Sequence, residues 1–198
     1  MATAALTRYS PEEYLAMERG AETRSEYIDG RIVALAGAQR PHIVIVANLV
    51  RELGVSLLET PCEIYPTEMK VKIEASGRYV YPDLCVSCDP AFEDGTADVL
   101  LNPLLIVEVL SDSTESYDRG EKFFHYRRIA SLREYVLVNQ KRCLVERYVR
   151  EGDFWRFTSL DDLDATLVLT SMDVEIPLRR IYIKALQLPV EEGSSSSS

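Results

Sequence analysis

The chain has 198 residues, of which 46% are hydrophobic and 27% are charged, a composition typical of one globular domain and not of a disordered protein. No apolar run approaches the roughly 18 residues of a membrane span, and residues 1–8 are too short and too weakly apolar for a signal peptide. We therefore expect a cytoplasmic protein with no membrane partner. The net charge of −10 weakens non-specific attraction to nucleic acid, although basic residues cluster locally over 119–133.

The first predicted elements are two helices and a hairpin. Ser10-Pro11-Glu12-Glu13 is a capping box with proline at the first helical position, which predicts a helix from 11 to about 19. Asp29-Gly30 between apolar-rich flanks predicts a β-hairpin over 26–33. Apolar residues at helical spacing over 41–58 predict a second helix, which we expect to be buried.

Strands follow in the middle of the chain. Residues 69–74 alternate in polarity and predict a strand with one solvated face, and 79–88 predict the next strand. Residues 89–103 have the composition of a polar loop. Residues 104–110 are apolar apart from Glu108, a pattern typical of a central strand buried on both faces.

From residue 111 onward, the sequence predicts a helix, a strand and then a β-meander. Residues 111–114 supply N-cap candidates for a helix from about 115 to 129, and 134–138 predict a strand. Turn residues then separate expected strands at 143–149, 154–159 and 166–169. The order predicts an α/β (α+β) domain over 1–190, with a mixed β-sheet flanked by helices and a C-terminal β-meander. Residues 191–198 form a low-complexity, Ser-rich tail that we expect to be disordered.

The four cysteines do not match a metal or redox motif. Cys85 and Cys88 form a lone C-x-x-C, and a zinc site needs two further ligands that the sequence does not offer at suitable spacing. In a strand these two residues point to opposite faces, and Asp89-Pro90 follows where a redox motif needs a helix. We expect reduced, mostly buried thiols.

Asp83 and Glu108 begin a candidate catalytic series. A carboxylate in a strand-like segment is unfavourable unless a metal ion or a basic side chain pairs with it. Two carboxylates on neighbouring strands can hold Mg²⁺ or Mn²⁺ beside a scissile phosphate, and the backbone carbonyl of Val109 can add a ligand. The pair therefore predicts a divalent-metal site.

Lys122 completes the series. Position 110 shares a strand face with Glu108, and it holds a leucine that cannot orient a water molecule. Asp118, Lys122 and Tyr126 follow at four-residue spacing and share one face of the predicted helix. If that face turns toward the strand end, Lys122 can polarise the attacking water or stabilise the transition state.

Each member of the series also fits a structural role. Asp83 can cap the start of a strand, Glu108 can form a structural ion pair, and Lys122 can be a solvated helix lysine. Taken together, the three residues favour the metal site.

Several stretches carry a family resemblance. They are 25–32, 41–42 with 48–49, 81–84, 105–114, 117–123, and 126–128 with 134–135. With them the chain resembles the Uma2 family of restriction-endonuclease-like proteins, in the PD-(D/E)XK nuclease superfamily, over about 7–185. The resemblance implies a restriction-endonuclease-like fold, with Asp83 and Glu108 at the two acidic metal positions. Leu110 departs from the usual lysine, and Lys122 takes over its role.

The resemblance also implies auxiliary residues, each with a structural alternative. Glu26 matches an early acidic position that adds a metal contact, or it is a surface charge of the hairpin. His42 approaches the site from its helix N-terminus, or its ring is satisfied by backbone. Tyr126 contacts phosphate or only packs, and His125 is expected at the surface.

We therefore expect a Mg²⁺- or Mn²⁺-dependent DNA endonuclease that acts as a homodimer. The alternative is a catalytically inactive nuclease-fold module that binds nucleic acid or protein, which the acidic charge and Leu110 favour. A purely structural ion pair between Glu108 and a basic residue is the third possibility.

Overall fold

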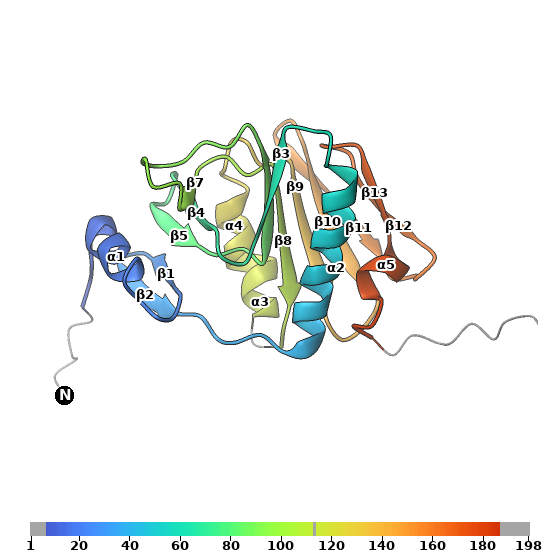
Figure 1. Cartoon of the computed structure of the whole chain (residues 1–198), viewed down its shortest axis with the longest axis horizontal. Coiled ribbons are helices and arrows are strands. Elements are labelled where there is room, and N and C mark those ends of the chain that lie inside the picture. Colours follow the sequence, from blue (N-terminus) through green and yellow to red (C-terminus); the bar gives the residue numbers. More distant parts are fainter. Residues whose placement is uncertain (1–6, 113, 187–198) are drawn as a thin grey trace, which may run out of the picture.

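The structure, a computed structural model, describes residues 7–112 and 114–186. Its centre is a six-stranded mixed sheet (Figure 1). In spatial order the strands are β11 (Phe154–Leu160), β10 (Val145–Glu151), β9 (Glu134–Asn139), β8 (Leu105–Leu110), β6 (Leu84–Cys88) and β3 (Cys62–Pro66). β8 and β9 are parallel, and the other neighbouring pairs are antiparallel.

A second sheet, formed by strands from the first half of the chain, lies on one face of the central sheet (Figure 1). In spatial order its strands are β2 (Arg31–Ala34), β1 (Ser25–Ile28), β5 (Arg78–Val80), β4 (Lys70–Ile73) and β7 (Val99–Leu100). The helices on that side are α1 (Pro11–Glu18), α3 (Glu115–Tyr117), the π-helical turn η1 (Asp118–Lys122) and α4 (Phe123–Tyr126). β4, β5, β7 and α4 share an apolar core with β8 and β9. Tyr14 of α1 packs instead with Tyr27, Tyr79 and Val99 in a separate cluster.

The other face of the central sheet is covered by α2 (Arg40–Ser56) and α5 (Leu178–Tyr182), with the hairpin of β12 (Thr166–Leu169) and β13 (Val174–Pro177). Every residue of β8 is buried, as expected for a strand with packed layers on both faces. The α/β (α+β) fold class is confirmed, and the expected meander strands at 143–149 and 154–159 pair as β10 and β11. The strand expected at 166–169 also forms, but it pairs with β13 in a separate two-stranded sheet and does not extend the meander. No helix in the described part of the chain is both long and apolar enough to cross a membrane.

Local signals account for the first elements. Ser10 and Glu13 exchange both hydrogen bonds of the capping box at the start of α1, as predicted. Asp29 and Gly30 have φ values of 51° and 83°, the left-handed backbone that a tight hairpin turn between β1 and β2 requires.

The predicted strand over 79–88 is wrong in one respect, because it is two strands in different sheets. β5 pairs with β1 and β4, whereas β6 pairs with β3 and β8. Pro82 lies between them and cannot donate a ladder hydrogen bond. Asp83 consequently sits where the chain passes from one sheet to the other.

Other predicted elements need smaller corrections. α2 is buried on one side only, and Val55 is 76% exposed, because only the sheet-facing stripe meets the core. The expected polar loop over 89–103 contains β7, which pairs in parallel with β4. The helix expected to reach 129 ends at Tyr126. Ser113 and the tail 191–198 lie outside the described residues.

The cysteine prediction is wrong for two of the four residues. Cys62 and Cys88 form a disulfide, while Cys85 is buried and free and Cys143 is partly buried and free. The physical reason is register: Cys62 and Cys88 are opposite each other on β3 and β6, so their sulfurs lie side by side. Structural disulfides are rare in reducing compartments, so this bond does not support the expected cytoplasmic location.

Removal of this disulfide is expected to lower the free energy of unfolding by about 2 kcal/mol, because the bond reduces the conformational entropy of the unfolded chain. The measurement is urea unfolding of the variant with both Cys62→Ser and Cys88→Ser. Cys143→Ser is the control and should unfold like the wild type. Identical unfolding of the wild type with and without dithiothreitol would contradict the prediction.

Candidate active site

A cleft of about 920 Å³ opens at the carboxyl ends of β8 and β9. Asp83, Glu108 and Lys122 all line it, together with His42 and Asp118. Four segments far apart in the sequence supply these residues: the start of α2, the connection between β5 and β6, β8, and η1. The structure thus brings the candidate catalytic series together in one depression.

Asp83 is held by two contacts on one carboxylate oxygen. His42 Nε2 lies 3.0 Å from Asp83 Oδ2, and the backbone N–H of Val109 donates to the same oxygen at 2.7 Å. His42 is on the first turn of α2, so its ring does approach the site as the resemblance implies. Val109 follows Glu108 directly, so the carboxylate of Asp83 lies against the peptide that joins Glu108 to Val109.

Glu108 is buried and contacts two side chains of the η1–α4 helix. Lys122 Nζ lies 2.8 Å from Glu108 Oε1, and the Tyr126 hydroxyl donates to the same oxygen at 3.0 Å. Burial is the largest influence and raises the pKa of Glu108 well above its usual value, although Lys122 acts in the opposite direction. The charged carboxylate is therefore costly in this position unless further positive charge approaches it.

Lys122 is surrounded by carboxylates from three elements. Besides Glu108, Asp118 Oδ1 lies 3.6 Å and Glu26 Oε1 lies 3.8 Å from Lys122 Nζ. Burial alone would lower the pKa of Lys122, but Glu108, Glu26 and Asp118 together raise it above its usual value. Lys122 is therefore a buried ammonium, and its alternative role as a solvated helix lysine is excluded.

The helical spacing of Asp118, Lys122 and Tyr126 does place them on one face, as predicted. The helix is interrupted there by the π-helical turn η1, which carries both Asp118 and Lys122. Such single π-helical turns occur often at functional sites. Burial raises the pKa of Asp118, and Lys122 partly offsets this effect. The Tyr135 hydroxyl donates to the Asp118 backbone carbonyl at 3.0 Å and ties the turn to β9.

Glu26 belongs to the site and is not a surface charge of the hairpin. It is 3% exposed, and its Oε1 accepts a hydrogen bond from the backbone N–H of Tyr81 at 3.1 Å. Tyr126 is fully buried against Glu108, so it supports the carboxylate from within the core. His125 is partly exposed and does not line the cleft, and burial lowers its pKa.

Leu110 is 2% exposed and packs in the apolar core with Ile106 and Tyr126. In the superfamily pattern this strand position holds a lysine. Here the residue is apolar, and so are the residues around it. Lys122, which reaches Glu108 from the helix, is the ammonium of this site.

The donor set suits a magnesium or manganese ion in chemistry and in charge. Asp83 and Glu108 offer hard oxygen donors, and Mg²⁺ commonly uses one or two carboxylates with water and substrate oxygens. Glu26 and Asp118 add negative charge, so three carboxylates surround the ammonium of Lys122, and Asp83 adds a fourth carboxylate near Glu108. Within residues 7–112 and 114–186, no group of three or more His, Cys, Asp or Glu side chains is arranged as a complete metal cage. The fit of an ion therefore rests on Asp83 and Glu108, and water and substrate oxygens would have to supply its other ligands.

Two further features of the cleft were not identified from the sequence. Gln140 follows β9, lines the cleft and is 4% exposed, and its amide oxygen is buried without a hydrogen-bond partner among the described residues. Its position after a buried strand was the only available signal, because ligands collect at the carboxyl ends of parallel strands. The apolar side chains of the first half of α2 also line the cleft.

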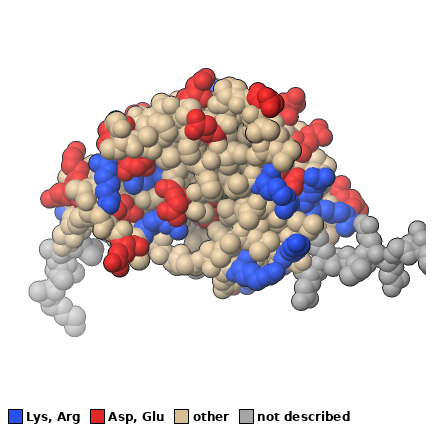
Figure 2. Space-filling model, in the orientation of Figure 1, with Lys and Arg blue, Asp and Glu red and all other residues tan. Residues whose placement is uncertain are grey.

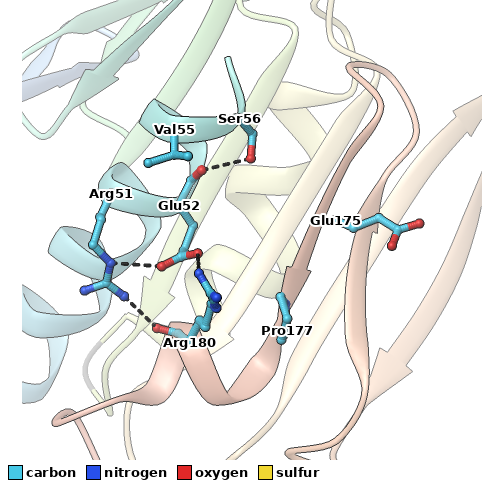
Figure 3. Close-up of a pocket in the computed structure, with 7 residues that line it drawn as sticks. All are labelled: Arg51, Glu52, Val55, Ser56, Glu175, Pro177 and Arg180. Carbon is cyan, nitrogen blue, oxygen red and sulfur yellow. Dashed lines mark hydrogen bonds and ion pairs between the residues drawn. The ribbon is translucent and has the colours of Figure 1, made fainter. Parts of the chain in front are cut away.

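A second, smaller pocket of about 380 Å³ lies between α2 and α5 (Figure 3). Its charged groups satisfy one another, since Glu52 accepts from Arg51 Nε at 2.9 Å and from Arg180 Nη1 at 3.1 Å. On the face in view, Lys and Arg side chains lie in separate groups among Asp and Glu (Figure 2). Neither feature offers the convergent carboxylates and lysine of the larger cleft.

This chain resembles known proteins both in sequence and in fold. Residues 11–179 match the Uma2 family, described as "Putative restriction endonuclease". Two uncharacterized proteins of Synechocystis, sll1609 and slr1290, are each 37% identical, over 82% and 76% of this chain and 93% and 79% of their own lengths. A crystal structure from Anabaena variabilis, titled as a putative nuclease belonging to DUF820, superposes with a TM-score of 0.72 at 18% identity, covering 89% of this chain and 98% of that one. The structural likeness confirms the nuclease-type fold. Because the family model matches residues 11–179, most of the sequence, this chain belongs to the Uma2 family.

Proposed function

We propose that this protein is a Mg²⁺- or Mn²⁺-dependent endonuclease that hydrolyses phosphodiester bonds in DNA. The observation that carries the proposal is the convergence of Asp83, Glu108 and Lys122 in one cleft, where carboxylates outnumber the ammonium. The description of the Uma2 family as restriction endonucleases supports the same reaction class.

Asp83 and Glu108 would hold the metal ion, with Glu26 close by and the backbone carbonyl of Val109 as the predicted further ligand. When bound, the ion supplies Lewis-acid stabilisation of the phosphoryl oxygens and an activated water. His42 and the Val109 N–H hold the carboxylate of Asp83 in place. Tyr126 does the same for Glu108. Lys122 places positive charge beside Glu108, where it can orient the attacking water or stabilise charge on the phosphate.

Metal binding is the first test, because it needs no knowledge of the substrate. Wild-type protein is expected to bind Mn²⁺ saturably at millimolar concentration, and Asp83→Asn to lose this binding. Calorimetry or water-proton relaxation measures both. Asp112→Asn is the matched control: Asp112 also lines the cleft, but it is exposed and pairs with Lys141.

Cleavage is then measured on plasmid and oligonucleotide DNA with Mg²⁺ or Mn²⁺. Asp83→Asn should reduce the rate about 100-fold or more, the size of effect seen when a group that stabilises transition-state charge is removed. Saturable binding by both Asp83→Asn and the wild type would contradict the assignment of Asp83 as a ligand.

The alternative function is an inactive nuclease-fold module that binds nucleic acid or protein. The apolar surroundings of Leu110 favour it, because the usual strand lysine has no counterpart there. Salt-sensitive DNA binding with no cleavage under any metal would support this alternative. The homodimer implied by the family resemblance remains a prediction, and the molar mass in solution tests it.

A further inference from the structure

The cleft has a lining of two chemical kinds. Besides the candidate catalytic groups, the lining includes aliphatic side chains from the β2–α2 connection and from α2. These aliphatic residues are Leu35, Ile43, Val46, Ala47 and Val50. Ile43 is 56% exposed and Ala47 is also exposed, so no described element of the chain covers them. An apolar surface next to a hydrolytic site is suited to the flat face of a base.

Gln140 supplies a polar group to the same cleft. The turn that carries it is fixed, because Asn139 Oδ1 accepts from the backbone N–H groups of Lys141 and Arg142 at 2.9 and 3.1 Å. The side chain of Gln140 is almost fully buried, and its amide oxygen has no hydrogen-bond partner among the described residues. A buried polar group without a partner is unfavourable, and a ligand that bonds it removes this cost.

The charge of the cleft does not favour a duplex. Among the described residues that line it, the cations are Arg24 and Lys122. Lys122 is already held by three carboxylates, and Arg24 contacts the carbonyl of Thr67 and the carboxylate of Glu68. Few cations are thus available for phosphate contacts, so most of the affinity has to come from contact with a base. A duplex keeps its bases paired and stacked, and cannot make that contact without unpairing.

We infer that the substrate of this site is a nucleotide with an unpaired base, and that Gln140 reads the edge of that base. In this arrangement the base lies against the aliphatic residues and its phosphate lies at Asp83 and Glu108, which line the same cleft. An amide offers one donor and one acceptor side by side, the pattern that complements adenine. A half-turn of the amide exchanges its oxygen and nitrogen, so either atom can face the base. The inference rests on the proposed nuclease function and names its substrate class.

The test is equilibrium binding of fluorescein-labelled 12-nucleotide oligomers of dA, dC and dT and of a 12-base-pair duplex, by fluorescence anisotropy in millimolar Ca²⁺. Single strands are expected to bind at least about tenfold more tightly than the duplex, which must first unpair. The dA oligomer should bind about tenfold more tightly than dC and dT, within the range of an amide–base contact.

Two variants separate the apolar surface from the base edge. Gln140→Leu should keep the preference for single strands and lose the preference for dA. Ala47→Glu should weaken binding of all single strands, because it places a charge among the aliphatic residues of the cleft. Val55→Glu is its matched control, since Val55 lies on the same helix, is 76% exposed and lines the other pocket (Figure 3).

The inference is overturned if the duplex binds as tightly as the single strands, if no oligomer binds, or if Gln140→Leu discriminates among bases as the wild type does. Loss of binding with Val55→Glu equal to that with Ala47→Glu overturns it as well. Cleavage of the same oligomers in Mg²⁺ is measured in parallel. The expected binding pattern without cleavage would remove the proposed nuclease function alone, whereas cleavage of duplex DNA without a preference for single strands would remove this inference alone.

Discussion

Lys122→Met is expected to lower the free energy of unfolding by about 3–5 kcal/mol, because it removes the ammonium from a cluster of three buried carboxylates. Glu108, Asp118 and Glu26 all lie within 3.8 Å of Lys122 Nζ. Methionine keeps much of the volume of lysine, so the loss reports on charge and not on a cavity. The measurement is urea unfolding with EDTA present, which keeps the site free of metal. Lys141→Met is the control, because Lys141 and its partner Asp112 are both largely exposed.

The effect of this substitution should depend on pH. The pKa values of Glu108 and Asp118 are raised in the folded protein, so these groups stabilise it most below their ordinary values, about 4.3 for Glu and about 3.9 for Asp, and the contribution is lost as pH rises. Lys122 lowers the pKa values of both groups, so its removal raises these values further. Ionising the two carboxyl groups in the folded variant then costs more stability as pH rises. The deficit of Lys122→Met should therefore be larger at pH 8 than at pH 5.5. A deficit that is small, or the same at both pH values, would show that the carboxylates are not stabilised by Lys122.

Arg147→Met is expected to cost about 3 kcal/mol of stability, because it leaves a buried carboxylate without its cation. Arg147 Nε lies 2.7 Å from Glu134 Oε2, and Glu134 is fully buried in β9. The backbone N–H of Ser171 still donates to the other oxygen at 2.7 Å, which places the expected cost at the lower end of the range for such pairs. Urea unfolding measures it.

The neighbouring strand offers the control for Arg147. Arg156 pairs with Glu151 at 2.6 Å, but both side chains are well exposed, so Arg156→Met should change stability by less than about 1 kcal/mol. Mn²⁺ binding by folded Arg147→Met should equal that of the wild type, whereas Lys122→Met alters the site itself. Equal costs for Arg147→Met and Arg156→Met would contradict the role of burial.

The two buried pairs show why a buried charge alone does not identify a site. Glu134 meets a single guanidinium and the backbone N–H of Ser171, and it lines neither of the two pockets described above. Glu108 meets one ammonium that it shares with two further carboxylates, and it lines a cleft with Asp83. The excess of carboxylates over cations, together with access from solvent, distinguishes the candidate active site from a structural ion pair.

Local sequence patterns determined several elements of this protein. The capping box at Ser10 and the turn at Asp29-Gly30 act through neighbouring residues, so they could be predicted without knowledge of the fold. The apolar run around Glu108 indicated a central strand, and the four-residue spacing of Asp118, Lys122 and Tyr126 indicated a shared helical face. In each case the determining interactions lie within a few positions along the chain.

Tertiary structure decided the features that depend on which strands become neighbours. Cys62 and Cys88 are 26 positions apart and pair only because β3 and β6 align in one register. Glu26 is buried because the sheet of β1 packs beside the η1 turn, a contact that its hairpin sequence does not encode. Gln140 joins the cleft because β9 lies parallel to β8. These positions are set by the sum of many weak long-range contacts, so the site was found from its charged residues while its full lining required the fold.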